Sequence, residues 1–194
     1  MHCSSLGPGI LFNSMQPAVF LDRDNTLIAN DGDLGDPDAV VLLDGVAEGI
    51  RRLDEAGYRL VVITNQGGVA RGCYQEADVD AVHERMQRLL GPSAKLSFYY
   101  CPFHPRGTVP RYTREHPWRK PAPGMLLEAA DRERLDLTAS WVVGDQPRDA
   151  QAGLAAGCRT ILLGTHDELI DARVLRVTNF TEAVERILDQ EANR

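Results

Sequence analysis

The sequence lacks several features that would assign it to a specialised class of protein. Its 21 Lys and Arg residues are outnumbered by 28 Asp and Glu residues, which gives a net charge of −7. A surface of that sign repels polyanions such as duplex nucleic acid. No apolar run approaches the roughly 20 residues that a membrane-spanning helix needs. We therefore expect neither a nucleic-acid partner nor a membrane partner.

Cysteine is scarce, and the cysteines are scattered along the chain. Cys3, Cys73, Cys101 and Cys158 form no Cys-x-x-Cys pair. A chain of this length can bury a core without disulfides. We expect the cysteines to be reduced and the protein to be cytoplasmic.

The first residues have no features of a targeting signal. Residues 1–14 contain no basic segment, and the apolar stretch at 9–12 is too short for a signal-peptide core. Division of the 194 residues by a typical domain size of about 150 gives one domain. We predict an N-terminal extension over residues 1–16 and one domain over 17–194, which we expect to be a monomer.

Short apolar runs alternate with amphipathic helical patterns along the chain. The run Ala18–Leu21 is apolar throughout and ends at Asp22, which is typical of a strand buried on both faces. This alternation predicts an α/β fold: a doubly wound, Rossmann-like parallel sheet with helices on both faces and no large cap domain. The other predicted strands are 60–63, 96–100, 141–143 and 160–163, and the predicted helices are 46–57, 79–89, 125–130, 147–157 and 181–188.

Polar side chains follow the predicted strands, at the edge of a parallel sheet where ligands bind. Asp22 and Asp24 are two residues apart, so in extended chain their side chains point the same way. Asp145 follows another strand and can supply a third carboxylate, and Lys120 would balance the charge. Carboxylates together with water and phosphate oxygens form the site that Mg²⁺ prefers. The set therefore suits phosphoryl transfer, in which positioning and charge neutralisation do most of the catalysis.

Each of these motifs also has an ordinary structural explanation. An Asp-x-Asp sequence after a strand can be a turn, and Thr64 and Asn65 can cap the segment that follows them. Asp145 can belong to the start of a helix at Pro147. Because the motifs occur together on one side of the predicted sheet, we favour the chemical interpretation.

The motifs resemble those of the haloacid dehalogenase (HAD) superfamily of aspartate-nucleophile phosphatases. Residues 64–72 and 119–125 further resemble the branch that contains D-glycero-D-manno-heptose bisphosphate phosphatases and histidinol-phosphate phosphatases. The resemblance covers residues 17–188. The matching motifs are Asp22-Arg-Asp24-Asn-Thr26, Thr64-Asn65-Gln66, Lys120 within Arg-Lys-Pro, and Gly144-Asp145-x-x-x-Asp149.

The resemblance implies a role for each motif residue. Asp22 would attack phosphorus, and Asp24 would first protonate the leaving oxygen and then activate water. Mg²⁺ would lie on Asp22, the backbone carbonyl of Asp24, and Asp145. Lys120 would steady the nucleophile and the phosphate, and Asp149 would be a supporting acid near the metal. The candidate substrate-binding residues are Thr64, Asn65, Gln66, Arg119 and Gln146, the last at a position where relatives of the heptose type often have lysine.

Many members of this branch carry zinc in the loop after the third strand, and this chain departs from their pattern. It keeps Cys101, but Phe103 stands two residues later, and His116-Pro-Trp118 replaces a Cys-x-Cys pair. Cys101, His104 and His116 could make three ligands, whereas structural zinc usually has four. We therefore expect no zinc, and a metal-free loop packed by Phe103 and Trp118.

The leading hypothesis is a Mg²⁺-dependent phosphomonoesterase that acts on a small phosphorylated metabolite through an aspartyl-phosphate. The irregular segment 101–123 is long enough to be a specificity loop, and its arginines could bind a second phosphate through paired hydrogen bonds. We expect a sugar bisphosphate such as D-glycero-D-manno-heptose 1,7-bisphosphate. The alternatives are a histidinol-phosphate phosphatase, a nucleic-acid 3′-phosphatase and a non-catalytic phosphate-sensing module. The basic residues of the loop are Arg106, Arg111, Arg114, Arg119 and Lys120.

Overall fold

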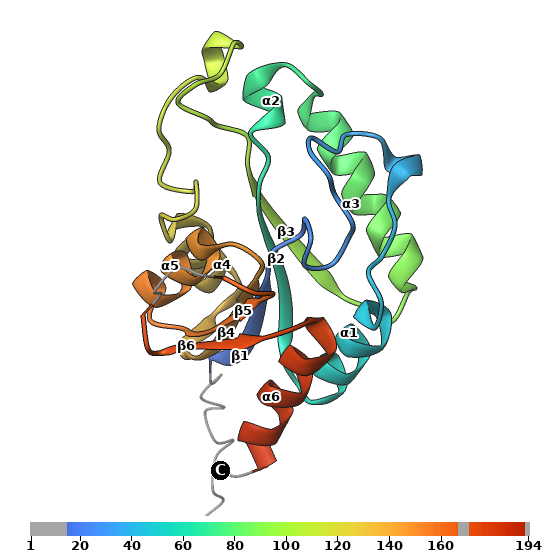
Figure 1. The fold of residues 1–194 in the computed structure, drawn as a ribbon, viewed down its shortest axis with the longest axis vertical. Coiled ribbons are helices and arrows are strands. Elements are labelled where there is room, and N and C mark those ends of the chain that lie inside the picture. The colour runs from blue at the N-terminus through green and yellow to red at the C-terminus, as the bar shows by residue number, and fades with distance from the viewer. Residues whose placement is uncertain (1–14, 167–170, 193–194) are drawn as a thin grey trace, which may run out of the picture.

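Parallel strands form the centre of the molecule (Figure 1). The computed structural model describes residues 15–166 and 171–192, and within them six strands pair in the order β3-β2-β1-β4-β5-β6. Every neighbouring pair is parallel. The strands are β1 (Gln16–Leu21), β2 (Arg59–Asn65), β3 (Leu96–Cys101), β4 (Leu135–Gly144), β5 (Arg159–Leu163) and β6 (Val174–Val177).

Helices cover both faces of the sheet, as Figure 1 shows. Val19 and Leu21 of β1 pack in the layer that contains α1, α3 and α6, whereas Ala18 and Phe20 pack toward α4 and α5. This alternation along one strand explains why β1 is apolar throughout. The helices are α1 (Val46–Glu55), α2 (Gly68–Arg71), α3 (Glu76–Leu90), α4 (Gly124–Glu133), α5 (Pro147–Ala156) and α6 (Phe180–Ala192).

The strand order reverses direction at β1, which lies between β2 and β4. In doubly wound sheets, ligands bind in the crevice outside the carboxyl ends of the strands at this reversal. The predicted site residues Asp22 and Asp145 directly follow β1 and β4, and so lie at this reversal. The predicted doubly wound α/β fold is confirmed.

Some elements were outside the sequence prediction. β6 has four residues, of which only the first and last are buried, so its apolar pattern is too short to recognise. β4 begins at Leu135, six residues before the predicted strand. The prediction missed this first half because it carries polar residues among the apolar ones. The single turn α2 follows Gly67 and contains Gly68, a composition that indicates a turn rather than a helix.

The two long segments after β1 and β3 form no separate domain in the described part of the chain. Residues 22–45 contain the short 3-10 turn η1 (Pro37–Ala39), and residues 102–123 contain η2 (Pro110–Tyr112). The backbone amides of Thr108 and Val109 donate to the carbonyl of Ala70, which fastens the second segment to α2. The prediction that no large cap is present is thus confirmed for the described residues.

The predicted N-terminal extension lies almost entirely outside the described residues, which begin at Met15. The domain boundaries therefore stay predictions. Over residues 15–166 and 171–192, no helix is both long enough and apolar enough to cross a membrane.

Candidate active site

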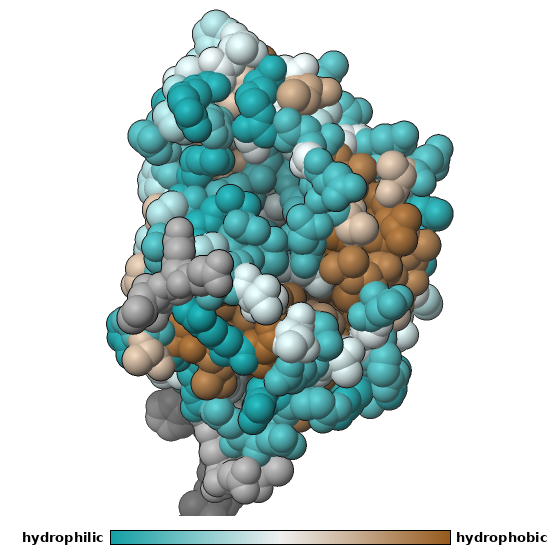
Figure 2. Space-filling view, in the orientation of Figure 1, coloured by the Kyte–Doolittle hydropathy of each residue, from teal (hydrophilic) through white to brown (hydrophobic). Residues whose placement is uncertain are grey.

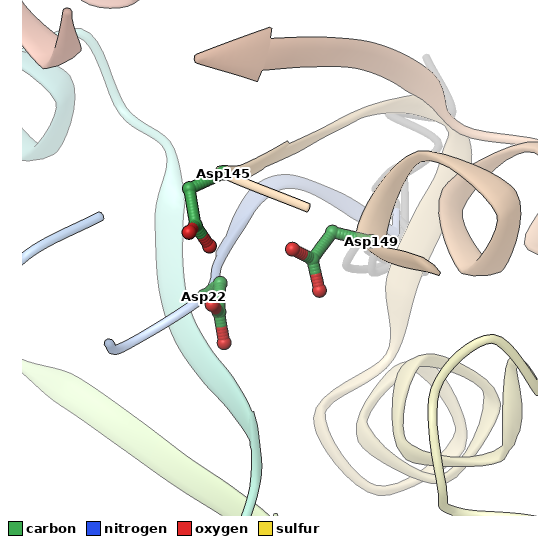
Figure 3. Close-up of side chains that lie close together, drawn as sticks. All are labelled: Asp22, Asp145 and Asp149. Atoms are coloured by element: carbon green, nitrogen blue, oxygen red, sulfur yellow. The ribbon is translucent and has the colours of Figure 1, made fainter. Parts of the chain in front are cut away.

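Three aspartates converge at the carboxyl end of the sheet (Figure 3). Asp22 follows β1, Asp145 follows β4, and Asp149 lies in the first turn of α5. One carboxylate oxygen of each lies within 4.8 Å of the other two. Pro147 begins α5, and the Asp149 side chain accepts a hydrogen bond from the backbone N–H of Gln146. The start of this helix therefore fixes where the third carboxylate stands.

Lys120 lies against two of these carboxylates and is itself buried. Its Nζ donates to Asp22 Oδ1 at 2.6 Å and to the carbonyl of Ile63 at 2.8 Å, and it lies 2.7 Å from Asp149 Oδ1. The ammonium group thus has two hydrogen-bond acceptors and a second ion-pair partner within reach. Because one ammonium faces a cluster of three carboxylates, the site retains an excess of negative charge.

Burial and charge act in opposite directions on this pair. Burial raises the pKa of Asp22 well above its usual range, although the Lys120 ammonium opposes the shift. Burial also lowers the pKa of Lys120, but Asp149 and Asp22 outweigh it and hold that pKa above its usual value. Lys120 therefore stays charged. The unfavourable effect of burial and of neighbouring carboxylates is seen instead in the raised pKa of Asp22.

The acidic cluster fits a divalent cation. Asp145 Oδ1 is buried and accepts no hydrogen bond from any described residue, while Oδ2 accepts one from the Gln146 amide at 2.7 Å. A buried carboxylate oxygen without a donor is uncommon in folded proteins. Beside two further carboxylates, it suits a hard cation that takes oxygen ligands.

Asp24 lies beside the cluster, held by hydrogen bonds on both of its oxygens. Its Oδ1 accepts from Arg23 and from Asn30 Nδ2, and its Oδ2 accepts from Thr64 Oγ1 and from Gln66 Nε2. The Asp24 side chain is 22% exposed, while that of Arg23 is fully buried. Asp24 is thus a firmly oriented carboxylate that still reaches the solvent side of the site.

The residues at the carboxyl end of β2 position their neighbours: Thr64 and Asn65 end the strand, and Gln66 follows it. Asn65 Nδ2 donates to the backbone carbonyl of Lys120, and Asn65 Oδ1 accepts from the backbone N–H of Lys120, both at 3.0 Å. This reciprocal pair of hydrogen bonds fixes the backbone of Lys120, which lies 55 residues from Asn65 in the sequence. Thr64 and Gln66 are buried, and the Gln66 amide holds both Thr64 and Asp24. The three predicted binding residues at the end of β2 therefore contact Lys120 and Asp24, which lie beside the acidic cluster.

A cavity of about 380 Å³ opens beside the aspartates. Asp24, Asn65 and Asp145 form part of its wall, together with Arg119 and Gln146. In the space-filling view, the middle of this face is largely hydrophilic, and hydrophobic surface gathers toward its right and lower parts (Figure 2). A larger hollow of about 710 Å³ runs along β3 among aromatic side chains and includes none of the three aspartates.

Three guanidinium groups line the same cavity: Arg71, Arg119 and Arg148. Only Arg119 belongs to the predicted basic loop. Arg111 instead lies over the ring of Tyr112, and Arg114 lies over the ring of Phe103. Of the basic residues of the predicted loop, Arg119 thus lies in the cavity wall, while aromatic side chains of the loop itself lie under Arg111 and Arg114.

Arg71 and Arg148 were missed because they lie on helices. Arg71 ends α2 and Arg148 is the second residue of α5, where sequence alone suggests solvated charge. The side chains of Arg71 and Arg119 both lie close to the backbone of Gly67. A Cβ at Gly67 would lie 3.1 Å from Nη1 of Arg71 and 3.4 Å from Nη1 of Arg119. The Gly-Gly sequence after Gln66 was the signal of this close approach.

Comparison with known proteins assigns the chain to a family. It is 42% identical over 149 residues to D-glycero-beta-D-manno-heptose-1,7-bisphosphate 7-phosphatase of Salmonella typhi, covering 76% of this chain and 79% of the relative. A family model described as HAD-hydrolase-like matches residues 117–175. The chain belongs to the HAD-like hydrolases. The resemblance seen in the sequence is thereby confirmed.

Solved structures agree with this assignment. The D,D-heptose 1,7-bisphosphate phosphatase of B. bronchiseptica, complexed with magnesium and phosphate, superposes with a TM-score of 0.79 at 30% identity, covering 90% of this chain and 99% of that one. The corresponding enzyme of Burkholderia thailandensis gives a TM-score of 0.65 at 28% identity, covering 89% and 99%. This HAD-like hydrolase is therefore an enzyme, a phosphatase of its family.

The three candidate zinc ligands of this HAD-like phosphatase have other neighbours. His104 Nδ1 accepts from the backbone N–H of Arg106, and His116 Nδ1 accepts from that of Trp118. The His116 ring stacks on Phe103, with ring centroids 4.3 Å apart. Within the described ranges, the aspartate cluster is the one group of three or more potential ligands close enough to share an ion, so Cys101, His104 and His116 form no such group.

Proposed function

We propose that this phosphatase removes one phosphate from a sugar bisphosphate, with D-glycero-D-manno-heptose 1,7-bisphosphate as the first substrate to test. The observation that carries the proposal is the buried Asp22 directly after β1, paired with Lys120 and clustered with Asp145, which lines a cavity whose wall bears three guanidinium groups. Arg71 is paired with Asp33. A single phosphate at Asp22 therefore leaves Arg119 and Arg148 without an anionic partner in the substrate. The relatives, which are heptose 1,7-bisphosphate phosphatases, support the same substrate class.

The proposed reaction has two steps. A carboxylate oxygen of Asp22 attacks phosphorus, and the bond from phosphorus to the sugar oxygen breaks. Asp24 enters this step as the carboxylic acid, gives that oxygen its proton and becomes the carboxylate. In the second step, Asp24 takes a proton from water, the water oxygen attacks the phosphorus of the aspartyl-phosphate, the bond from phosphorus to the Asp22 oxygen breaks, and inorganic phosphate leaves. Asp22 and Asp24 then return to their starting states.

The surrounding residues serve this reaction by position and charge. Lys120 holds Asp22 in place and offsets the charge of the transferred group, while Asp149 holds Lys120 from the other side. Asn65 fixes the backbone of Lys120, and we propose that Thr64 and Asn65 also donate to phosphate oxygens. Asp22, Asp145 and the backbone carbonyl of Asp24 would hold Mg²⁺. When bound, Mg²⁺ supplies positive charge at the phosphoryl oxygens.

Metal dependence is the first expected property. A chelator should stop phosphate release and added Mg²⁺ should restore it, because the carboxylate cluster needs a cation before an anionic phosphate can approach. Mg²⁺ should also raise the melting temperature, since a ligand present at about 100 times its Kd stabilises the folded state by about 2.7 kcal/mol. Asp145→Asn should remove most of this thermal shift. Full activity in chelator, or an unchanged shift in Asp145→Asn, would count against the site.

The second phosphate is proposed to lie against Arg119. Arg119 is half-buried, and burial is the main cause that lowers the pKa of its guanidinium, yet it remains a cation at any physiological pH. Its Nη1 donates to the carbonyl of Phe103 at 3.2 Å, which fixes the group toward the cavity. The adjacent Lys120 faces the reacting phosphate, so the two side chains can hold two phosphates of one substrate.

Arg119→Ala should raise KM for a sugar bisphosphate about tenfold or more and leave KM for a monophosphate within about twofold. Only the bisphosphate loses a charge-assisted hydrogen bond, which is worth about 1.5–3 kcal/mol. Steady-state kinetics on both substrates measure the difference. The matched control is Arg106→Ala, because Arg106 is exposed in the same loop and is outside the cavity wall. Equal effects on both substrates, or a wild-type preference for histidinol phosphate, would reject the second phosphate site.

A further inference from the structure

We propose that Tyr74, acting through Gln66, positions Asp24 for proton transfer to the leaving oxygen. Tyr74 precedes α3 and lies on the far side of Gln66 from Asp24. It is not among the residues that line the cavity in the described structure. Tyr74 is thus a positioning residue rather than a catalytic one, and its assignment rests on the proposed role of Asp24.

A chain of hydrogen bonds joins the two residues. Tyr74 Oη donates to Gln66 Oε1 at 2.7 Å, and Gln66 Nε2 donates to Asp24 Oδ2 at 2.9 Å. The same Nε2 also lies 2.7 Å from Thr64 Oγ1. Gln66 is 1% exposed, so water cannot replace a partner that its amide loses.

The direction of every bond in this chain is fixed by chemistry. Arg23 Nη2 also lies 2.9 Å from Gln66 Oε1, and a guanidinium can only donate. The Gln66 amide must therefore present its oxygen to Arg23 and Tyr74 and its nitrogen to Asp24. In the flipped orientation, the amide nitrogen would face the Arg23 donor and the amide oxygen would face a carboxylate. The Tyr74 hydroxyl adds a second donor that holds the orientation seen here.

Tyr74 is well suited to a fixed donor role. Burial is the main cause that raises the pKa of Tyr74 to about 12, so its hydroxyl keeps its proton through the physiological range. Its ring is closely packed between two glycines. A Cβ at Gly35 would lie 2.6 Å from Tyr74 Cβ, and one at Gly68 would lie 2.6 Å from Tyr74 Oη. Both glycines therefore make room for this side chain, one from the segment after β1 and the other from α2.

The testing variant is Tyr74→Phe, which keeps the ring and removes the donor. The variant should fold, because Gln66 Oε1 still accepts from Arg23. We expect kcat/KM for a sugar phosphate to fall about three- to tenfold, the equivalent of one net hydrogen bond of about 0.5–1.5 kcal/mol. KM should change less than about twofold, since Tyr74 does not line the cavity and an interaction used only in the transition state alters kcat.

The leaving group separates positioning from a general structural defect. p-Nitrophenolate leaves without needing a proton at neutral pH, whereas a sugar alkoxide needs one. Tyr74→Phe should therefore lower kcat/KM for p-nitrophenyl phosphate less than about twofold. Tyr100→Phe is the matched control, because the Tyr100 hydroxyl donates to Glu76 at 3.0 Å, away from the aspartate cluster, and both substrates should be unaffected.

Asp24→Asn is measured in parallel, so that a failure of the proposed role of Asp24 can be distinguished from a failure of the inferred role of Tyr74. If Asp24→Asn retains full activity on the sugar phosphate, the proposed function of Asp24 fails, and the role of Tyr74 fails with it. If Asp24→Asn is crippled and Tyr74→Phe behaves as wild type, only the Tyr74 inference is overturned. Equal losses of Tyr74→Phe on the two substrates would also overturn it, because they would show a structural effect without selectivity for proton transfer.

Discussion

Asp22→Asn is expected to lower phosphate release by about 10³-fold or more, because the amide cannot form an aspartyl-phosphate. The substitution changes neither the volume of the side chain nor its place at the end of β1. Lys120 keeps its ion pair with Asp149 at 2.7 Å and its bond to the carbonyl of Ile63. One ammonium then faces one adjacent carboxylate, so the loss of folding stability should be small. Phosphate release and thermal unfolding measure the two effects.

Asp131→Asn is the matched control for this prediction, since Asp131 is exposed on α4. It makes the same chemical change outside the site and should leave the turnover unaltered. If Asp22→Asn kept a substantial fraction of the wild-type rate, the nucleophile would have to be another group. If it unfolded at 25 °C, Asp22 would be as much a structural residue as a chemical one.

Lys120→Met should abolish turnover and also destabilise the protein by about 3–5 kcal/mol, the cost typical of breaking a buried ion pair. The methionine fills much of the same space but leaves the carboxylates of Asp22 and Asp149 buried beside each other without a cation. Urea unfolding in the presence of a chelator measures this loss without a compensating metal.

A second substitution tests the cause of that loss. Adding Asp149→Asn to Lys120→Met removes one of the two unpaired charges, so the double variant should be more stable than Lys120→Met alone. Lys95→Met is the control, because Lys95 is the other lysine of the chain and is exposed. A Lys120→Met protein as stable as the wild type would show that the buried pair contributes nothing to the fold.

Most of the sheet could be predicted from the sequence, because buried parallel strands leave continuous apolar runs. The runs at β1 and β2 are both flanked by Gly, Pro or polar residues that end them. β6 could not be found in this way, since an edge strand with two exposed residues of four has no distinctive pattern. The strand order was also beyond the sequence, because pairing depends on contacts between residues far apart in the chain.

The aspartates of the site could be predicted because each follows a strand or begins a helix. Asp22, Asp145 and Asp149 were named from the sequence and lie within one cluster. What could not be predicted is which arginines face the cavity. Arg71 and Arg148 enter it from helix ends, while Arg111 and Arg114 lie over aromatic rings of their own loop. A count of basic residues in a segment carries no information on such packing.

Tyr74 is another residue whose role could not be predicted from the sequence. A tyrosine just before a helix has no sequence feature that distinguishes it from an ordinary core residue. Its proposed function follows only from its bond to Gln66, eight residues earlier, and from the bond of Gln66 to Asp24, which follows the neighbouring strand β1. Residues that act through a second side chain are therefore recognised only once the structure is known.

The stereochemical course at phosphorus tests the central claim most directly. A phosphorothioate substrate, whose transferred group carries sulfur and two oxygen isotopes, is hydrolysed in water of the third oxygen isotope, and the configuration of the released inorganic thiophosphate is determined. Attack by Asp22 followed by attack by water comprises two in-line displacements, each of which inverts phosphorus, so the account predicts net retention. Net inversion would show a single displacement by water and would contradict an aspartyl-phosphate on Asp22.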